Sequence, residues 1–298
     1  MNAKPKLLIT GGNGQLGQEL QALANQFPDF EFYSTARESL DISDDQQITQ
    51  LFEKEQFDYC INCAAYTAVD RAEAEKELAE KINIKAVENL AAICARQEIP
   101  LIHFSSDYVY HGHQNHPYCE DDPTFPEGIY AVTKLAGEAA ALQRHHQTMI
   151  IRTSWVYSAF GHNFVKTMLR LGRERDELRV VFDQIGTPTY AYDLAFAVLT
   201  ILHKVEQQKV PAAALSGIFN YSNEGVTSWY DFALSIFELS GITCNVTPIE
   251  SKDFPTPATR PFYSVLNKNK IKSTFALSIP HWRDSLQHCL ERLPKTIS

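Results

Sequence analysis

The sequence predicts an α/β protein: a doubly wound parallel sheet with helices on both faces, followed by a smaller C-terminal lobe. Three observations support this prediction. Short apolar runs alternate with helical patterns through the first half of the chain. A glycine-rich turn follows the first apolar run directly, and the alternation loosens after Trp155. Alternation of strand and helix argues for parallel strands joined by crossover helices.

The elements expected in the first half follow one another in that order. Strands are expected in the apolar runs 6–10, 30–35, 59–62, 100–106 and 148–154. Helices are expected at 15–26, 44–55 and 71–97, and another helix opens within 128–140. Asp41 and Ser43 precede the second helix and can cap it, because their side chains accept hydrogen bonds from a first turn.

The second half is expected to be more irregular. Helices are predicted at about 162–173, 191–205, 228–239 and 281–292, with short strands near 178–182 and 217–221 and a loop at 254–261. We expect a dinucleotide-binding domain of Rossmann type from residues 1–154 plus about 188–218. The remaining residues, about 155–187 and 219–298, are expected to form a substrate-binding lobe.

Composition limits the classes of function. The 298 residues are 44% hydrophobic, which suffices for a large core and one or two domains. A net charge of −9 argues against a nucleic-acid-binding surface. The N-terminus is too weakly apolar for a signal peptide, and no apolar run is long enough for a membrane span. The six scattered cysteines predict reduced thiols in a cytoplasmic protein, with Cys60 and Cys63 packed in the core.

The glycine-rich turn is the first candidate site. Gly11, Gly14 and Gly17 are spaced G-x-x-G-x-x-G between the first strand and the first helix. In such a turn the first glycine permits the tight bend, the second lets the backbone approach a pyrophosphate, and the third allows close packing of helix on sheet. The helix N-terminus adds N–H donors, so the motif predicts a dinucleotide site.

The end of the second strand bears on the choice of cofactor. An acidic residue there favours NAD, because it hydrogen-bonds the ribose. Here the strand end carries no acid, and Arg37 follows shortly after. Arginine favours a 2′-phosphate and therefore NADP, although Arg37 can equally be a solvated loop residue.

Tyr130 and Lys134 form the second candidate site. They are four residues apart on a predicted helix and therefore share one face. A neighbouring ammonium favours phenolate, which lowers the pKa of the tyrosine and lets it exchange a proton near neutral pH. Taken alone, the pair is also compatible with an ordinary surface contact.

In combination, the glycine motif and the Tyr–Lys pair resemble the extended short-chain dehydrogenase/reductase family. Six segments narrow the resemblance to the dTDP-4-dehydrorhamnose reductase family, and they run over nearly the whole chain. The segments are INCAAYTAVDRAE (61–73), HFSSDYVYHG (103–112), YAVTKLAGE (130–138), RTSWVYS (152–158), DQIGTPTY (183–190) and TPATRPFYSVLN (256–267). The resemblance implies reduction of the C4 ketone of a dTDP-linked sugar by NADH or NADPH, the last step toward dTDP-L-rhamnose.

The resemblance also implies roles for particular residues. Tyr130 would be the general acid, Lys134 would lower its pKa and bind the nicotinamide ribose, and Ser106 would hydrogen-bond the substrate oxygen. Ser106 stands where the family has Thr, and it can alternatively cap the strand end. The cofactor would contact Gly11, Gly14, Gln15, Leu16, Gly17, Arg37, Asp41, Ile42, Ala65, Tyr66, Thr67 and Phe104, besides Tyr130 and Lys134. The sugar nucleotide would contact Ser106, Asp107, Trp155, Thr67, Val69 and Arg260, of which Trp155 can also be a core aromatic and Arg260 a partner of an internal acid.

Some features depart from the family or stay open. The family often has Asn and Gly where this chain has Gly128 and Ala131. Some members bind magnesium between two subunits, and Glu19 matches one ligand position, so magnesium and a homodimer enter as expectations of the resemblance. His111, His113 and His116 can hold zinc in principle, but a flexible lid over the substrate is the preferred interpretation.

Two other functions share these motifs. One is a reductase or epimerase of a different nucleotide-linked 4-keto sugar, which would differ in the second lobe and the 111–128 loop. The other is a non-catalytic NADP-binding module like the regulatory subunit of methionine adenosyltransferase. A complete set of Ser106, Tyr130 and Lys134 argues for catalysis, whereas a complex with a synthetase chain would favour the module.

Overall fold

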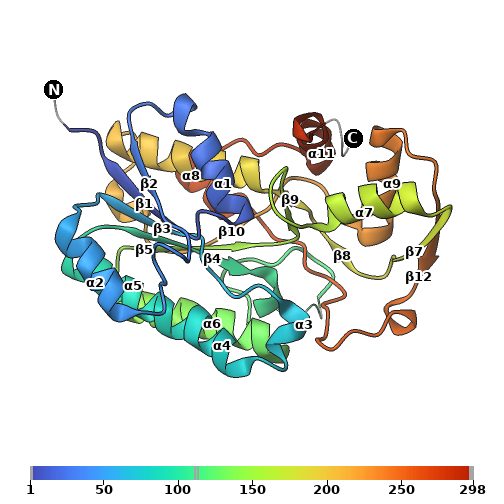
Figure 1. Ribbon diagram of the computed structural model, residues 1–298, viewed down its shortest axis with the longest axis horizontal. Helices are drawn as coiled ribbons and strands as arrows, with labels where there is room; N and C mark the ends of the chain where they lie inside the picture. Colours follow the sequence, from blue (N-terminus) through green and yellow to red (C-terminus); the bar gives the residue numbers. More distant parts are fainter. Residues whose placement is uncertain (1–2, 111, 113, 295–298) are drawn as a thin grey trace.

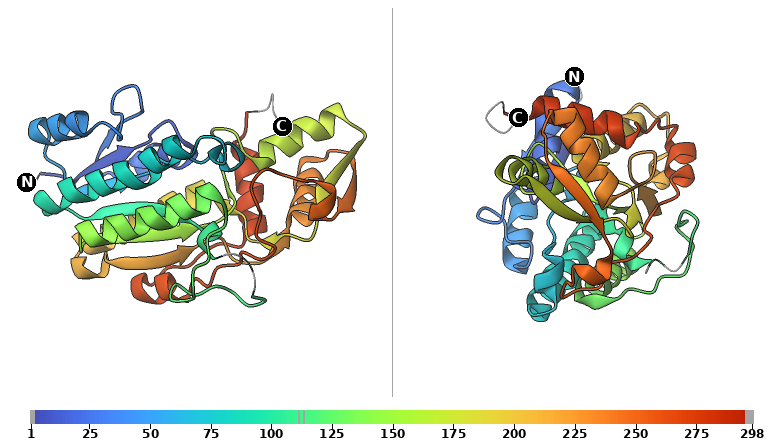
Figure 2. Two further views of the ribbon diagram at one scale, coloured as in Figure 1. Left: turned by 90° about the horizontal axis from the view of Figure 1, so that it is seen from below. Right: turned by 90° about the vertical axis from the view of Figure 1, so that its right-hand side faces the viewer.

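The protein has a large sheet-containing part and a smaller lobe beside one end of the sheet (Figure 1). This computed structural model describes residues 3–110, 112 and 114–294. Within these residues, no helix combines the length and the apolarity that crossing a membrane requires. Seen from below, the smaller lobe extends past the sheet rather than covering one of its faces (Figure 2, left).

The central sheet confirms the predicted fold class. Its strands follow the order β10-β5-β4-β3-β1-β2, and all neighbours pair in parallel. The bounds are β1 Lys6–Thr10, β2 Glu31–Ser34, β3 Tyr59–Asn62, β4 Leu101–Ser106, β5 Thr148–Thr153 and β10 Gly217–Tyr221. The central strands are buried along their whole length, as expected when helices cover both faces of a parallel sheet.

Helices cover the two faces as separate layers, each with its own core. Alternate residues of a strand point to opposite faces, so Leu7 and Ile9 pack in one core and Leu8 in the other. On the first face lie α1 (Gln15–Ala22) and α8 (Ala191–Glu206). On the second lie α2 (Asp45–Lys54), α5 (Ala86–Arg96) and α6 (Gly128–Arg144).

The expected helix at 71–97 is broken into pieces. The chain forms α3 (Val69–Ala72), α4 (Lys76–Glu80), one π-helical segment (Lys81–Lys85) and then α5. Asn83 lies in the π segment, where its side chain bonds both the backbone N–H and the carbonyl of Tyr66. A tertiary contact therefore overrides the uniform helical pattern of the sequence.

The cap of α2 is also different from the expectation. The Asp44 carboxylate accepts hydrogen bonds from the N–H groups of Gln46 and Gln47, so Asp44 is the N-cap. Asp41 and Ser43 instead bond to each other in the preceding turn. The predicted position was therefore wrong by one residue relative to Ser43, although the type of cap was right.

The smaller lobe has its own apolar core. It contains α7 (Phe164–Glu174), β7 (Glu177–Val181), α9 (Trp229–Ser240), β12 (Asn245–Ile249) and α11 (Trp282–Arg292). β7 and β12 pair in parallel, and β12 was missed because Pro248 argues against a strand interior. The remaining short elements are β6 Val156–Tyr157, β8 Ile185–Gly186, β9 Thr189–Tyr190, β11 Thr227–Ser228 and α10 Asn269–Phe275.

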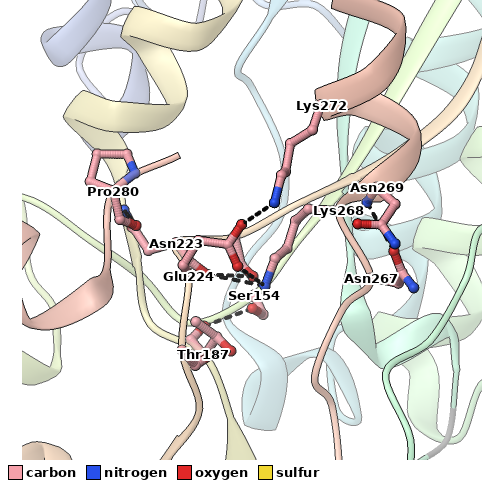
Figure 3. A network of polar contacts seen from close by, with 11 residues as sticks. Ser154, Thr187, Asn223, Glu224, Asn267, Lys268, Asn269, Lys272 and Pro280 are labelled. Atoms are coloured by element: carbon pink, nitrogen blue, oxygen red, sulfur yellow. Dashed lines mark hydrogen bonds and ion pairs between the residues drawn. The ribbon is translucent and has the colours of Figure 1, made fainter. Parts of the chain in front are cut away.

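A polar network joins the segment after β10 to the C-terminal part of the chain (Figure 3). The Asn223 side chain accepts a hydrogen bond from the N–H of Tyr190 at 2.7 Å and donates to the Asp193 carboxylate at 2.7 Å. Glu224 pairs with Lys272 at 2.7 Å and with the buried Lys268 at 3.4 Å. These contacts fix the segment after β10, where the chain passes from the sheet to the smaller lobe.

Candidate active site

The glycine turn is a close-packed backbone cradle. Gly11 has φ +67°, and a Cβ atom there would lie 2.6 Å from the Ala64 nitrogen. A Cβ at Gly17 would lie 2.5 Å from the Gly11 carbonyl oxygen, to which the Gly14 N–H donates at 2.9 Å. Glycine alone lacks the Cβ atom that would clash at positions 11 and 17, and it readily adopts the positive φ found at position 11.

α1 begins directly after this turn and leaves donors at its N-terminus. Gly14 is its N-cap and supplies no side-chain cap, so the N–H groups of the first turn, beginning with Gln15 and Leu16, face an anion-binding position. Gln15 also reaches the smaller lobe, where its side-chain oxygen accepts from Asn163 at 2.9 Å. The turn therefore fits a pyrophosphate, as the sequence predicts.

The segment after β2 presents one exposed cation. The Arg37 side chain is 73% exposed and lies 4.0 Å from an Asp41 oxygen. Asp41 accepts hydrogen bonds from Ser43, which lowers the pKa of its carboxyl group. Ile42 is buried with Leu40 in the core, so only its backbone can border a ligand.

The segment after β3 passes between the glycine turn and α6. Tyr66 is buried, and its hydroxyl donates to Glu75 at 2.8 Å, while Tyr130 packs against the same small cluster. Ala65 and Val69 are half-buried, and Thr67 is exposed. Their positions border the space between the two candidate sites.

Ser106, Asp107 and Tyr130 come together where β4 ends and α6 begins, and Lys134 lies one turn further along α6. We call these four residues the catalytic corner, after the role proposed for them below. The Ser106 hydroxyl donates to Asp107 Oδ1 at 3.0 Å and accepts from the Tyr108 N–H at 3.2 Å. It also lies close enough to the Tyr130 phenol to lower the pKa of that group. The Lys134 ammonium donates to the Phe104 carbonyl at 2.7 Å, which places Phe104 at the site through its backbone.

Two contacts fix α6, which carries Tyr130 and Lys134. At its middle, Glu138 forms a fully buried ion pair with Arg152 of β5 at 2.7 Å. At its start, the Ile129 N–H donates to the Glu73 carboxylate at 2.8 Å. Gly128, where the family often has Asn, has φ +79°, and a Cβ there would lie 2.8 Å from the same carboxylate oxygen. A carboxylate from α3's end thus occupies the first turn of the helix.

Burial dominates the proton affinities of the catalytic corner. It raises the pKa of Tyr130 to about 12, against an opposing contribution from Ser106. It lowers the pKa of Lys134 to about 8, against the attraction of Glu138. The expected lowering of the Tyr130 pKa by Lys134 is therefore not found. The phenol is neutral near pH 7, which is the form that can donate a proton.

A cavity of about 870 Å³ lies mostly in the smaller lobe, and Tyr108 in its lining packs edge-on against Tyr130 of the catalytic corner, with ring centroids 5.7 Å apart. Its lining includes Arg260 and Tyr108, together with two residues that the sequence did not single out, Asp70 and Trp229. The Arg260 guanidinium pairs with the Asp70 carboxylate at 2.7 Å. Arg260 therefore has an internal acidic partner, which was one of the two roles expected for it. Asp70 lies within the segment 61–73 and could have been considered, whereas Trp229 carries no sequence signal.

Trp155 lies behind the cavity wall, against Trp229. Its ring stacks on Trp229 with centroids 3.6 Å apart and an interplanar angle of 10°. Its backbone has φ +47°, and a Cβ at Gly186 would lie 2.7 Å from its ring. A residue in the left-handed region that is held by such close packing is a feature of functional sites.

Glu19 does not fit a magnesium ligand within this chain. One of its oxygens accepts from the Ser158 hydroxyl at 2.6 Å, and the other pairs with Arg292 at 2.8 Å. The residues that the structure describes contain no group of His, Cys, Asp and Glu side chains that could hold a metal ion. Of the histidine cluster, His116 is exposed, and His111 and His113 lie outside the described residues.

Comparison with known proteins gives consistent matches over almost the whole chain. The family model described as RmlD substrate binding domain matches residues 5–294. A dTDP-4-dehydrorhamnose reductase of Sinorhizobium fredii is 40% identical over 284 residues, covering 94% of this chain and 95% of that protein.

Solved structures agree with the sequence matches. A dTDP-4-dehydrorhamnose reductase from Clostridium acetobutylicum has a TM-score of 0.89 and 40% identity, covering 96% of this chain and 98% of that one. The enzyme of that name from Bacillus anthracis, solved in complex with NADP, has a TM-score of 0.91 and 37% identity, covering 97% and 99%. With the glycine turn, the catalytic corner and full-length similarity all present, the chain belongs to the dTDP-4-dehydrorhamnose reductase family.

Proposed function

We propose that the protein reduces the C4 ketone of dTDP-4-dehydro-L-rhamnose to dTDP-L-rhamnose with NADPH or NADH. The observation that carries this proposal is the convergence of Ser106, Tyr130 and Lys134 at the carboxyl edge of the sheet, next to a glycine turn that fits a pyrophosphate. The full-length similarity to enzymes of that name supports it.

Tyr130 is the proposed general acid. Its phenol is neutral near pH 7 because burial raises its pKa to about 12, so it holds the proton that the ketone oxygen must receive. Ser106 offers a second hydroxyl where negative charge develops on that oxygen. Lys134 is proposed to hold the cofactor ribose, and its ammonium stabilises phenolate after the proton has left Tyr130.

The bound nicotinamide would supply the hydride. In this proposal the backbone of Gly11, Gly14 and Gly17 and the first N–H groups of α1 hold the pyrophosphate. Arg37 is free to reach a 2′-phosphate, because its guanidinium is exposed. The remaining cofactor contacts are assigned to Gln15, Leu16, Asp41, Ile42, Ala65, Tyr66, Thr67 and Phe104.

The sugar nucleotide is assigned to the cavity between the catalytic corner and the smaller lobe. Trp229, on which Trp155 stacks, contributes to its apolar wall, and the Asp70–Arg260 pair gives it a charged one. Arg260 can exchange part of its contact with Asp70 for a phosphate oxygen. Thr67, Val69, Ser106 and Asp107 would border the sugar. The smaller lobe then serves as the substrate-binding part and the sheet as the dinucleotide-binding part.

The test is cofactor oxidation with a panel of keto sugars. The purified chain is mixed with NADPH or NADH and with enzymatically made dTDP-4-dehydro-L-rhamnose, and near-ultraviolet absorbance follows cofactor oxidation. We expect rapid oxidation with this ketone and little with its 4-keto-glucose precursor. Oxidation only with another ketone would replace the substrate, and tight NADPH binding without any oxidation would favour the regulatory-module alternative.

The proposal also retains two expectations from the sequence. The six cysteines, all free, suit a reducing cytoplasm, where such a pathway enzyme would work. Sedimentation of the purified chain tests the expected homodimer.

A further inference from the structure

Asp107 has an unusual environment for a carboxyl group. Its side chain is only 3% exposed, and among the described residues no group lies within hydrogen-bond geometry of its Oδ2 atom, although the Ser264 hydroxyl is close enough to affect the carboxyl pKa. No lysine or arginine pairs with it among the described residues. Burial raises its pKa to about 7, while the hydroxyls of Ser264 and Ser106 oppose this shift. A carboxyl group in this position can therefore exist in both protonation states near neutral pH.

The hydroxyl of Ser106 is shared among more neighbours than its single proton can serve. A serine hydroxyl has one proton to donate and two lone pairs that accept. The Tyr108 N–H takes one lone pair at 3.2 Å. The Ser106 hydroxyl then has one proton and one lone pair left. It shares them between Asp107 Oδ1, at 3.0 Å, and the side of the site where Tyr130 lies.

The protonation state of Asp107 decides how these two are distributed. An ionised carboxylate only accepts, so Ser106 donates to it and can merely accept on the Tyr130 side. The phenol proton of Tyr130 is then drawn toward Ser106, away from a ketone oxygen. A carboxylic acid protonated on Oδ1 instead donates to Ser106, which frees the serine proton to point into the site.

We propose that Asp107 is a positioning residue whose carboxyl group decides whether the Ser106 hydroxyl donates toward the substrate ketone or away from it. The inference rests on the proposed function, since that ketone is the group to be hydrogen-bonded. The protein is competent for reduction when Asp107 is protonated. Both donors, Ser106 and Tyr130, then face the oxygen on which charge develops.

The groups around Asp107 come from three segments of the chain. Ser106 and Tyr108 flank it, Tyr130 approaches from α6, and Ser264 approaches from the C-terminal part. The charges of Asp70 and Arg260 affect the pKa of Tyr108, and they are not among the causes of the pKa shift of Asp107. Lys134 is the other group in the catalytic corner that titrates close to neutral pH, with a pKa of about 8.

The test compares the pH dependence of kcat in the wild-type chain and in Asp107→Asn. With its NH2 group toward Ser106 and its oxygen toward Ser264, the asparagine amide donates to Ser106 at every pH. The wild-type kcat should fall as pH rises through about 7, where Asp107 ionises. In Asp107→Asn this fall should move up by about one pH unit, to the titration of Lys134 near 8.

Several outcomes would overturn the proposal. An unmoved midpoint would mean that Asp107 is not the titrating group. A uniform loss of kcat at every pH, or a change in KM alone, would make Asp107 a simple structural or substrate contact. In a Ser106→Ala background, Asp107→Asn should leave the pH profile unchanged; a persisting shift would show that Asp107 acts without Ser106.

Two further measurements test the proposal if Asp107→Asn misfolds or if the wild type does not reduce the ketone. Should Asp107→Asn fail to fold, Ser264→Ala should raise the same midpoint, because a donor to the carboxylate is lost, and an unmoved midpoint would contradict the proposal. In the ligand-free protein, the carbon-13 carboxyl resonance of Asp107 should titrate at higher pH in Ser106→Ala than in the wild type. This readout needs no turnover, so it separates failure of the inference from inactivity of the wild type on the ketone, which would refute the proposed function alone.

Discussion

The glycine turn after β1 and the catalytic corner after β4 are built from different parts of the chain. The turn works through backbone atoms, and its glycines matter because side chains are absent. The corner works through buried side chains whose proton affinities are set by burial. The difference teaches that a backbone site depends on close approach, whereas a side-chain site depends on desolvation, and the two should fail in different ways when altered.

The largest expected effect is on the rate, through Tyr130. Tyr130→Phe removes the proton donor and leaves the ring in place, so kcat should fall by about 10²- to 10⁴-fold. The Kd for NADPH, measured by fluorescence titration, should stay within a factor of about two to three, because no cofactor-binding backbone is touched. An unchanged kcat would remove Tyr130 from the proposed mechanism.

The opposite pattern is expected in the glycine turn. A Cβ at Gly17 would lie 2.5 Å from the Gly11 carbonyl oxygen, so Gly17→Ala should cost about 1–3 kcal/mol of stability and weaken NADPH binding. At Gly14 the nearest atom to a Cβ is 3.2 Å away, so Gly14→Ala should weaken NADPH binding with a smaller loss of stability. Calorimetry and thermal unfolding measure both. If both variants bound NADPH normally, the turn would not hold the cofactor.

A smaller and more selective effect is expected at Arg37. Arg37→Ala should weaken NADPH by about tenfold or more, the usual contribution of a charge-assisted hydrogen bond, and leave NADH almost unchanged. The control is Arg96→Ala, which removes an exposed arginine of α5. Equal losses for the two cofactors would mean that Arg37 does not bind the 2′-phosphate.

The smallest effect is expected at the start of α6. Glu73→Ala leaves the Ile129 N–H without its acceptor and should lower kcat only a few-fold, in line with about 0.5–1.5 kcal/mol for one exposed hydrogen bond. Glu73→Gln keeps an acceptor oxygen and should restore most of the rate. Equal kcat values in the wild type, Glu73→Ala and Glu73→Gln would mean that this hydrogen bond does not help to position Tyr130.

The sheet could be predicted closely because its signals are local. β1 and β3 have the predicted bounds, since each is a short apolar run between turns. The helix at 71–97 was predicted in its extent but not in its irregularities, such as the π segment where Asn83 contacts Tyr66, a residue that only the fold brings near it. β12 was missed for the opposite reason, since its local signal, Pro248, points away from a strand.

The placement of the candidate site residues was predictable, but their electrostatics were not. Motif spacing places Tyr130, Lys134 and Ser106 on elements that meet at one edge of the sheet, and they do meet there. Spacing says nothing of desolvation, which here raises the pKa of Tyr130 against the opposing contribution of Ser106. The stacking of Trp155 on Trp229 was beyond sequence reasoning, because these residues lie on separate segments of the smaller lobe.

The most direct test of the proposed reaction is to identify and count its product. The purified chain is incubated with NADPH and dTDP-4-dehydro-L-rhamnose, and the nucleotide sugars are separated and identified by nuclear magnetic resonance. The proposed function predicts dTDP-L-rhamnose in equimolar amount to the NADPH consumed, with almost none from Tyr130→Phe. An unchanged ketone in the presence of bound NADPH, or a product of different configuration at C4, would contradict it.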